Sequence, residues 1–132
     1  MICAFTGHRP EHLPWGRDED DPRCRALKIL LRRTVQQVYD RGFRTFLCGM
    51  ARGCDQYFAE AVLACRAAGT APEAILTAMV PCPSQKDGWP EEEQARYDAL
   101  LAACSAVEVL EPVYTPGCML RRNREMILRA QL

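Results

Sequence analysis

The sequence has no excess of charge of either sign and no long apolar run. Its 17 lysines and arginines balance 17 aspartates and glutamates, so there is no overall positive field to hold a long polyanion. No window approaches the roughly 20 apolar residues that a membrane helix requires. Residues 1–5 run directly into a strand-like segment without a basic leader. We therefore expect a cytoplasmic protein that associates neither with membranes nor with nucleic acid.

Paired-cysteine motifs are also absent. Eight cysteines occur, mostly inside apolar stretches, and none forms a CxxC pair. A zinc knuckle needs soft ligands at short spacing, and a disulfide-rich domain would not have 48% hydrophobic residues. We expect buried free thiols, with no metal site and no cofactor. The 132 residues contain no repeat or linker, so residues 1–132 are expected to form one domain.

Four apolar runs of β-forming residues alternate with segments of helical periodicity. Because a parallel connection must cross a sheet face, usually through a helix, this alternation predicts parallel strands. We predict an α/β fold, a Rossmann-like three-layer sandwich with a mostly parallel sheet of at least four strands in the order 3-2-1-4. The predicted buried strands are Ile2 to Phe5, Thr45 to Cys48, Ile75 to Val80 and Ala106 to Leu110.

The first two strands lead into glycine-containing loops. In the first loop, Gly7 lets backbone amides approach an anion, and Arg9 supplies a charge-assisted contact. An ordinary turn and a structural His8 are the competing interpretations. The second loop opens directly onto a helix, so its amides and those of the helix favour phosphate or carboxylate. The candidate ligand-binding residues are Thr6, Gly7, His8 and Arg9 in the first loop, and Gly49, Met50, Ala51, Arg52, Gly53 and Asp55 in the second.

Two further features leave alternatives open. Asp55 either caps its helix or holds a ribose hydroxyl, and we favour capping. Arg121, Arg122 and Arg124 crowd the start of the last helix, where the helix dipole is already positive. A bound anion would relieve that conflict, which makes Arg122 a ligand-binding candidate, and three solvated arginines are an equally good interpretation. Two more ligand-binding candidates are Asn123, which suits a base or ribose, and Tyr114, which either stacks on a base or fills packing space.

Three motifs together resemble the YpsA-like family of the SLOG (SMF/DprA and LOG) superfamily. They are Thr6 to Pro10, Gly49 to Asp55, and Tyr114 to Met119 leading into Arg122-Asn123. The loop that holds Gln85 and Trp89 is similar too, so the resemblance covers nearly the whole chain. It implies a Rossmann-like domain that binds a nucleotide or nucleotide-derived ligand, such as ADP-ribose or NAD, as a sensing or regulatory module.

The resemblance also supplies two alternatives. Residues 49–55 and 122–124 resemble the glycine and arginine-asparagine motifs of DprA, which implies single-stranded nucleic-acid binding; the balanced charge argues against it. LOG enzymes are nucleotide N-glycosidases, but their catalytic glutamate lies in a second glycine loop that is absent up to Leu132. We expect either a shortened member or a partner chain that completes the pocket, and we assign no catalytic residue. Unpaired sheet edges predict a homodimer.

Overall fold

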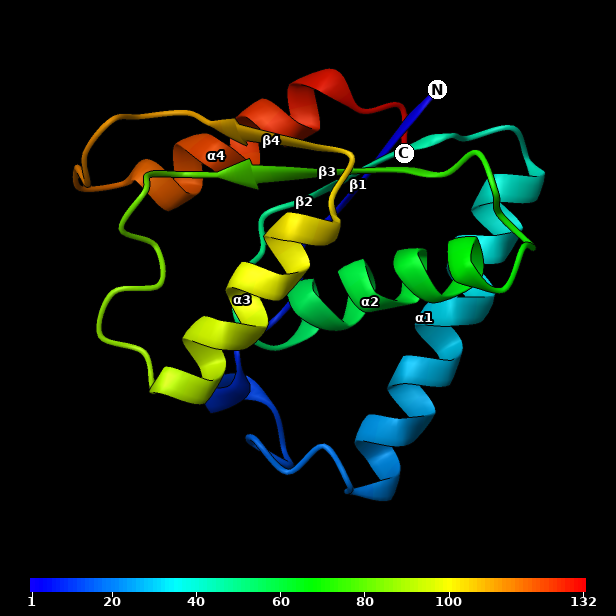
Figure 1. The fold of residues 1–132 in the computed structure, drawn as a ribbon, viewed down its shortest axis with the longest axis horizontal. Helices are drawn as coiled ribbons and strands as arrows, with labels where there is room; N and C mark the ends of the chain where they lie inside the picture. The colour runs from blue at the N-terminus through cyan, green and yellow to red at the C-terminus, as the bar shows by residue number, and fades with distance from the viewer.

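Four parallel strands form one sheet in the computed structural model, which describes all 132 residues, and helices cover both faces of this sheet (Figure 1). The predicted Rossmann-like α/β sandwich is therefore confirmed. The strands are β1 (Ile2–Phe5), β2 (Thr45–Cys48), β3 (Ile75–Val80) and β4 (Ala106–Val109). The helices are α1 (Pro22–Asp40), α2 (Cys54–Ala67), α3 (Glu91–Ala103) and α4 (Cys118–Arg129), with a short 3-10 helix η1 (Pro10–His12).

The strand order is β1-β2-β3-β4, so the predicted order 3-2-1-4 is wrong. β4 pairs with β3, with Ala106 opposite Thr77 and Val109 opposite Val80. Right-handed crossovers between strands that advance in one direction all fall on one face, which explains why α1, α2 and α3 lie together (Figure 1). The prediction had the chain change direction across the sheet after β3. In the structure this change comes after β4, where α4 crosses the opposite face of the sheet.

After α4 the chain returns to the outer edge of β1 (Figure 1). The Ala4 amide donates to the Leu132 carbonyl over 2.9 Å, and the Gln131 amide donates to the Ile2 carbonyl over 2.9 Å. This edge of the sheet is therefore partly paired. The other edge is β4, whose four residues are all exposed, so the prediction of a buried strand there is wrong.

The two faces of the sheet carry very different amounts of core. A cluster of 24 buried residues fills the space between the sheet and α1 to α3, with the Phe5 and Phe58 rings stacked at 4.6 Å. On the α4 face the cluster contains only Leu47, Met79 and Met126. α4 meets the sheet through a narrow stripe of one residue per turn. That stripe is Cys118, Arg122 and Met126.

The composition predicted buried free thiols and no membrane helix. All eight cysteines are free thiols and seven of them are buried, as predicted. None of the helices combines the length and the apolar character that would be needed to cross a membrane.

Candidate functional site

The loops that follow β1 and β2 lie against each other at the carboxyl ends of the strands. The Cys54 amide, at the start of α2, donates to the His8 carbonyl over 3.0 Å. A Cβ on Gly7 would lie 2.5 Å from the Cβ of Cys54, and a Cβ on Gly53 would lie 2.6 Å from the His8 carbonyl oxygen. Gly53 also has a φ of +87°, which favours glycine. Both glycines are thus required by the contact between the loops themselves.

The Asp55 carboxylate links the two loops through hydrogen bonds to their backbones. Its side chain is buried, and its two carboxylate oxygens accept hydrogen bonds from the amides of Gly7 (3.1 Å) and Ala51 (3.3 Å). The N-cap of α2 is Gly53, with no side-chain cap, so the predicted capping role of Asp55 is wrong. Burial raises the pKa of Asp55 to about 6, although the Arg122 charge and the two amides oppose this rise.

Arg122 lies beneath the same loops and is only 3% exposed. Its Nη1 donates to the carbonyl of Gly49 over 2.5 Å and to that of Met79 over 3.3 Å, at the ends of β2 and β3. Its Nε donates to Asn123 Oδ1 over 2.7 Å. A Cβ on Gly49 would overlap the guanidinium, so glycine is required there too.

The other two arginines of the helix start differ from Arg122. Arg121 is exposed and forms an ion pair with Glu111 over 2.7 Å, and Arg124 is exposed. The cationic start of α4 is therefore accommodated by strand-end carbonyls and by a carboxylate of the chain. No bound anion is needed to explain it.

Gln85 and Tyr97 complete this buried arrangement. Gln85 Nε2 donates to the Gly49 carbonyl over 3.0 Å, and the Tyr97 hydroxyl donates to Gln85 Oε1 over 3.0 Å. The sequence analysis named Gln85 only as part of a loop similar to that of the YpsA-like family, and it missed this contact. The position of the loop directly after β3 was the one sequence signal that could have indicated it. We call Asp55, Gln85, Tyr97 and Arg122 the polar layer.

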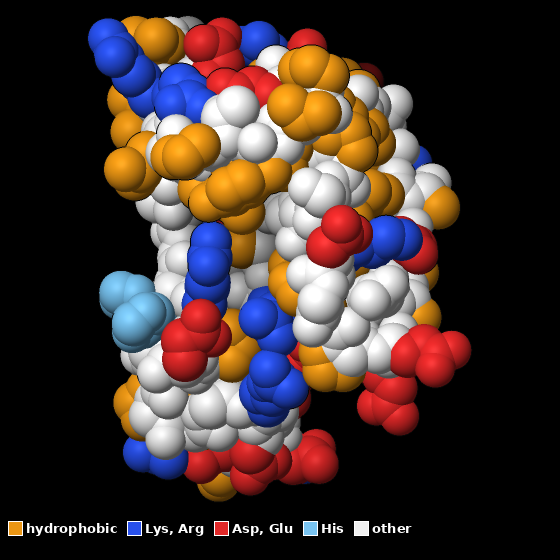
Figure 2. Space-filling model, turned by 90° about the vertical axis from the view of Figure 1, so that its left-hand side faces the viewer, with side chains coloured by type: hydrophobic (Ala, Val, Ile, Leu, Met, Phe, Trp, Pro, Cys, Tyr) orange, Lys and Arg blue, Asp and Glu red, His pale blue; other side chains and the backbone are white.

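Above the polar layer lies an exposed rim that contains Arg9. Thr6 to Arg9 are all exposed, and the Arg9 side chain has no hydrogen bond or ion pair within the chain. Its charge lies close enough to lower the pKa of both Asp55 and Arg122. Figure 2 views the molecule from this end, where basic side chains gather around a hollow. A cavity of about 40 Å³, here called the arginine pocket, is lined by Arg9, Ala51, Arg52, Gln85, Trp89 and Met119.

Arg52 is held from two sides. Its Nη1 forms an ion pair with Glu93 Oε2 over 2.8 Å, and its guanidinium lies 4.9 Å from the centre of the Trp89 ring. Arg52 also lines a second cavity, of about 410 Å³, which we call the mixed-charge cleft. The charged residues lining this cleft are Arg17, Glu19, Arg52, Glu92, Glu93 and Arg96. The acidic 18–21 segment is also held, because Glu19 pairs with Lys28 (2.7 Å) and Arg96 (2.5 Å).

Backbone donors are available beside Arg52. The amides of Arg52, Gly53 and Asp55 donate no hydrogen bond within the chain, whereas the next two amides of α2 bond to the Gly53 carbonyl. Unpaired amides at the start of a helix are donors for phosphate or carboxylate. Arg52 lines both the arginine pocket and the mixed-charge cleft, and Gly53 lines the cleft, whereas Asp55 lines neither.

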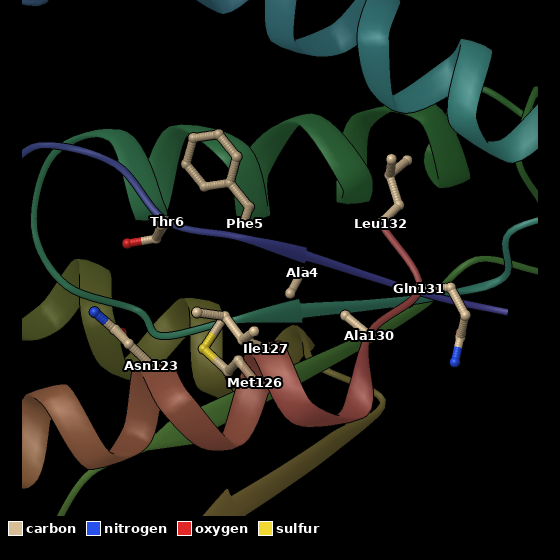
Figure 3. Close-up of a pocket in the computed structure, with 9 residues that line it drawn as sticks. All are labelled: Ala4, Phe5, Thr6, Asn123, Met126, Ile127, Ala130, Gln131 and Leu132. Carbon is tan, nitrogen blue, oxygen red and sulfur yellow. The ribbon is translucent and has the colours of Figure 1, made fainter.

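A third cavity, of about 260 Å³, lies between β1 and α4 (Figure 3). Its walls are mostly apolar and include Phe5, Met126 and Ile127. Thr6 and Asn123 lie at the end nearest the loops. Because Asn123 Oδ1 accepts from Arg122, the amide nitrogen of Asn123 is left as a donor at this end of the cavity.

The structure sorts the predicted ligand-binding residues into separate groups. Arg9, Ala51 and Arg52 meet in the arginine pocket, and Thr6 and Asn123 meet in the cavity beside β1. Tyr114 is 61% exposed and lines none of the three cavities described. The side chain of Met50 is fully buried on a backbone with a φ of +61°. His8 is exposed with its ring 6.1 Å from that of His12, while Gly7, Gly49, Gly53, Asp55 and Arg122 form the contacts beneath the rim.

Comparison with known proteins agrees with the resemblance found in the sequence. The model of the YspA SLOG family matches residues 3–131. The chain is also similar to a UPF0398 protein of Bacillus pumilus (strain SAFR-032), with 25% identity over 128 residues. That similarity covers 96% of this chain and 67% of the relative.

Proposed function

We propose that this chain, which belongs to the YspA SLOG family, binds a nucleotide or nucleotide-derived ligand such as ADP-ribose or NAD. We propose further that it acts as a sensing or regulatory module. The observation that carries the proposal is an arginine without a protein partner. Arg9 lines a pocket with Arg52, whose own backbone amide, like that of Gly53, donates no hydrogen bond.

The phosphate end of the ligand is assigned to the arginine pocket. The guanidinium groups of Arg9 and Arg52 and the backbone amides of Arg52 and Gly53 supply charge-assisted donors for phosphate oxygens. Arg122 acts differently in this proposal, because its Nη1 already binds two carbonyl oxygens beneath the loops. It positions the loops, and Asp55 does the same through Gly7 and Ala51.

The base is assigned to the cavity between β1 and α4. Apolar walls suit a flat ring, and the free amide nitrogen of Asn123 and the hydroxyl of Thr6 provide polar contacts at the end nearest the loops. Arg122 fixes the orientation of Asn123, so the buried arginine also determines which group faces the base. The proposal assigns no catalytic step to any residue.

The test is calorimetry with ADP-ribose, NAD, AMP and cyclic AMP on the unmodified chain, on Arg9→Ala and on Arg124→Ala. We expect at least one ligand to bind. Its affinity should fall about 10- to 100-fold in Arg9→Ala, the cost of a lost charge-assisted contact. Arg124 is also exposed but lies outside the arginine pocket, so its removal should change the affinity less than twofold. Absence of binding by all four ligands, or equal affinity in Arg9→Ala, would contradict the proposal.

A further inference from the structure

Arg52 is the charged residue that the arginine pocket and the mixed-charge cleft share. Its guanidinium therefore forms part of the wall between them. It is held there by the ion pair with Glu93 and by the face of Trp89. Any anion in the arginine pocket must bind next to a guanidinium that already has a carboxylate partner.

Glu93 is unusually engaged for a residue in the first turn of a helix. One carboxylate oxygen pairs with Arg52 over 2.8 Å and the other with Arg17 over 3.4 Å. The side chains of Glu93 and Arg52 are only 24% and 21% exposed, so water and salt screen this charge less than a charge on the open surface. Because Arg52 lines the arginine pocket, the Glu93 carboxylate lies one ion pair away from that pocket.

We propose that Glu93 determines which ligand charges the arginine pocket accepts, by opposing any anion that binds to Arg52. This inference rests on the proposed function. The repulsion grows with the charge of the ligand, so Glu93 disfavours a multiply charged phosphate more than a singly charged phosphodiester. The site then selects ligands whose phosphates carry little charge or are bridged, as in a diester or a dinucleotide.

The substitution Glu93→Gln separates charge from geometry. Glutamine keeps a carbonyl oxygen that accepts from Arg52, and Trp89 still packs against the guanidinium. Glu92 offers a matched control, because it lines the same cleft on the same helix turn but is exposed and forms no ion pair with Arg52. Glu92→Gln removes an equal charge without changing the ion pair.

Calorimetry with cyclic AMP, AMP and ADP tests the inference on the unmodified chain and on both variants. In Glu93→Gln we expect affinity to rise about threefold for cyclic AMP and about tenfold for AMP, with a larger rise for ADP. In Glu92→Gln the changes should stay below twofold. Binding of these three ligands that appears only in Glu93→Gln, while the unmodified chain binds ADP-ribose or NAD, would also support the inference, since the carboxylate would then suppress binding of the more charged ligands.

Other results overturn it in distinguishable ways. If the unmodified chain binds and Glu93→Gln binds no more tightly, the inference fails and the proposed function stands. Equal gains for all three ligands, or equal gains in Glu92→Gln, also overturn the inference, because they would indicate a general effect of net charge. Silence of all three proteins toward all three ligands overturns this inference, and silence of the unmodified chain toward ADP-ribose and NAD as well rejects the proposed function.

Discussion

Arg122 and Arg9 reach the same pair of loops from opposite environments. Arg122 is buried, and its donors reach the carbonyls of Gly49 and Met79 and the side chain of Asn123. Arg9 is exposed and has no hydrogen-bond acceptor or carboxylate partner in the chain. Sequence reasoning treats both arginines as phosphate contacts. The structure distinguishes them: Arg122 stabilises the backbone of the loops, whereas Arg9 has no partner within the chain.

The same division runs through the whole site. The polar layer consists of groups whose hydrogen bonds end on backbone atoms or on each other, so it fixes where the loops lie. The rim above it consists of side chains and amides that the fold does not use. Losing a member of the polar layer should therefore reduce stability, whereas losing a member of the rim should reduce binding alone.

The largest expected effect follows from replacing Arg122 with methionine. The substitution leaves two strand-end carbonyls without this donor and leaves Asp55 buried without a nearby cation, which should reduce the free energy of unfolding by about 3 to 5 kcal/mol. Urea unfolding followed by circular dichroism measures this loss. Arg121→Met, one residue earlier on an exposed ion pair, should cost less than about 1 kcal/mol. Similar losses in the two variants would show that the buried Arg122 contributes no more to stability than an exposed ion pair does.

A smaller loss is expected from Gly53→Ala. The new Cβ would meet the His8 carbonyl on a backbone with a φ of +87°, which should cost about 2 to 3 kcal/mol. Gly88 has a similar φ of +79° with open space around it, so Gly88→Ala should cost only about 1 kcal/mol from the backbone alone. The difference between their unfolding midpoints in urea measures the contact between the loops. Equal midpoints would show that this contact contributes nothing.

The pH dependence of stability should show the burial of Asp55. Its pKa is about 6 in the folded chain and near 3.8 when unfolded, so between these values the folded state binds more protons. Stability therefore rises as the pH falls through this window. Relative to Asp55→Asn, which does not titrate, the unmodified chain should gain about 2 kcal/mol between pH 7 and pH 4.5. Urea unfolding at both pH values measures the gain, and a constant difference would contradict it.

The smallest expected effect is that of Arg9→Ala on stability. Because the side chain contacts no partner in the chain, its removal should change the free energy of unfolding by less than about 0.5 kcal/mol. The same urea experiment applies without ligand. A loss above 1 kcal/mol would mean that Arg9 belongs with the polar layer after all.

The strands and helices were predictable because their signals are local. Apolar runs such as Ile75 to Val80 and the helical spacing of Leu31, Val35 and Val38 depend only on neighbouring residues. The strand order was not predictable in this way, because it depends on which face of the sheet α3 covers. Tyr97 and Leu100 of α3 join the same core as α2, and no sequence pattern distinguishes this from packing on the opposite face.

The site was predictable to a similar depth. Loops after parallel strands meet at one sheet edge, which is why Arg9, Ala51 and Arg52 could be expected to lie together, and they line one cavity. The burial of Arg122 was not foreseeable, because an arginine in the first turns of a helix looks the same whether it faces water or a carbonyl oxygen. Glu93 was missed for the same reason: only the fold brings it to Arg52.

The pairing of Gln131 and Leu132 with β1 has a practical consequence for anyone who attaches a tag. Leu132 lies alongside Ala4 and runs in the direction of β1. A peptide joined after Leu132 would be directed toward Phe5 and Thr6, into the mouth of the cavity shown in Figure 3. A purification tag or fluorophore is better placed before Met1, at the opposite end of that strand, where it leaves the cavity open.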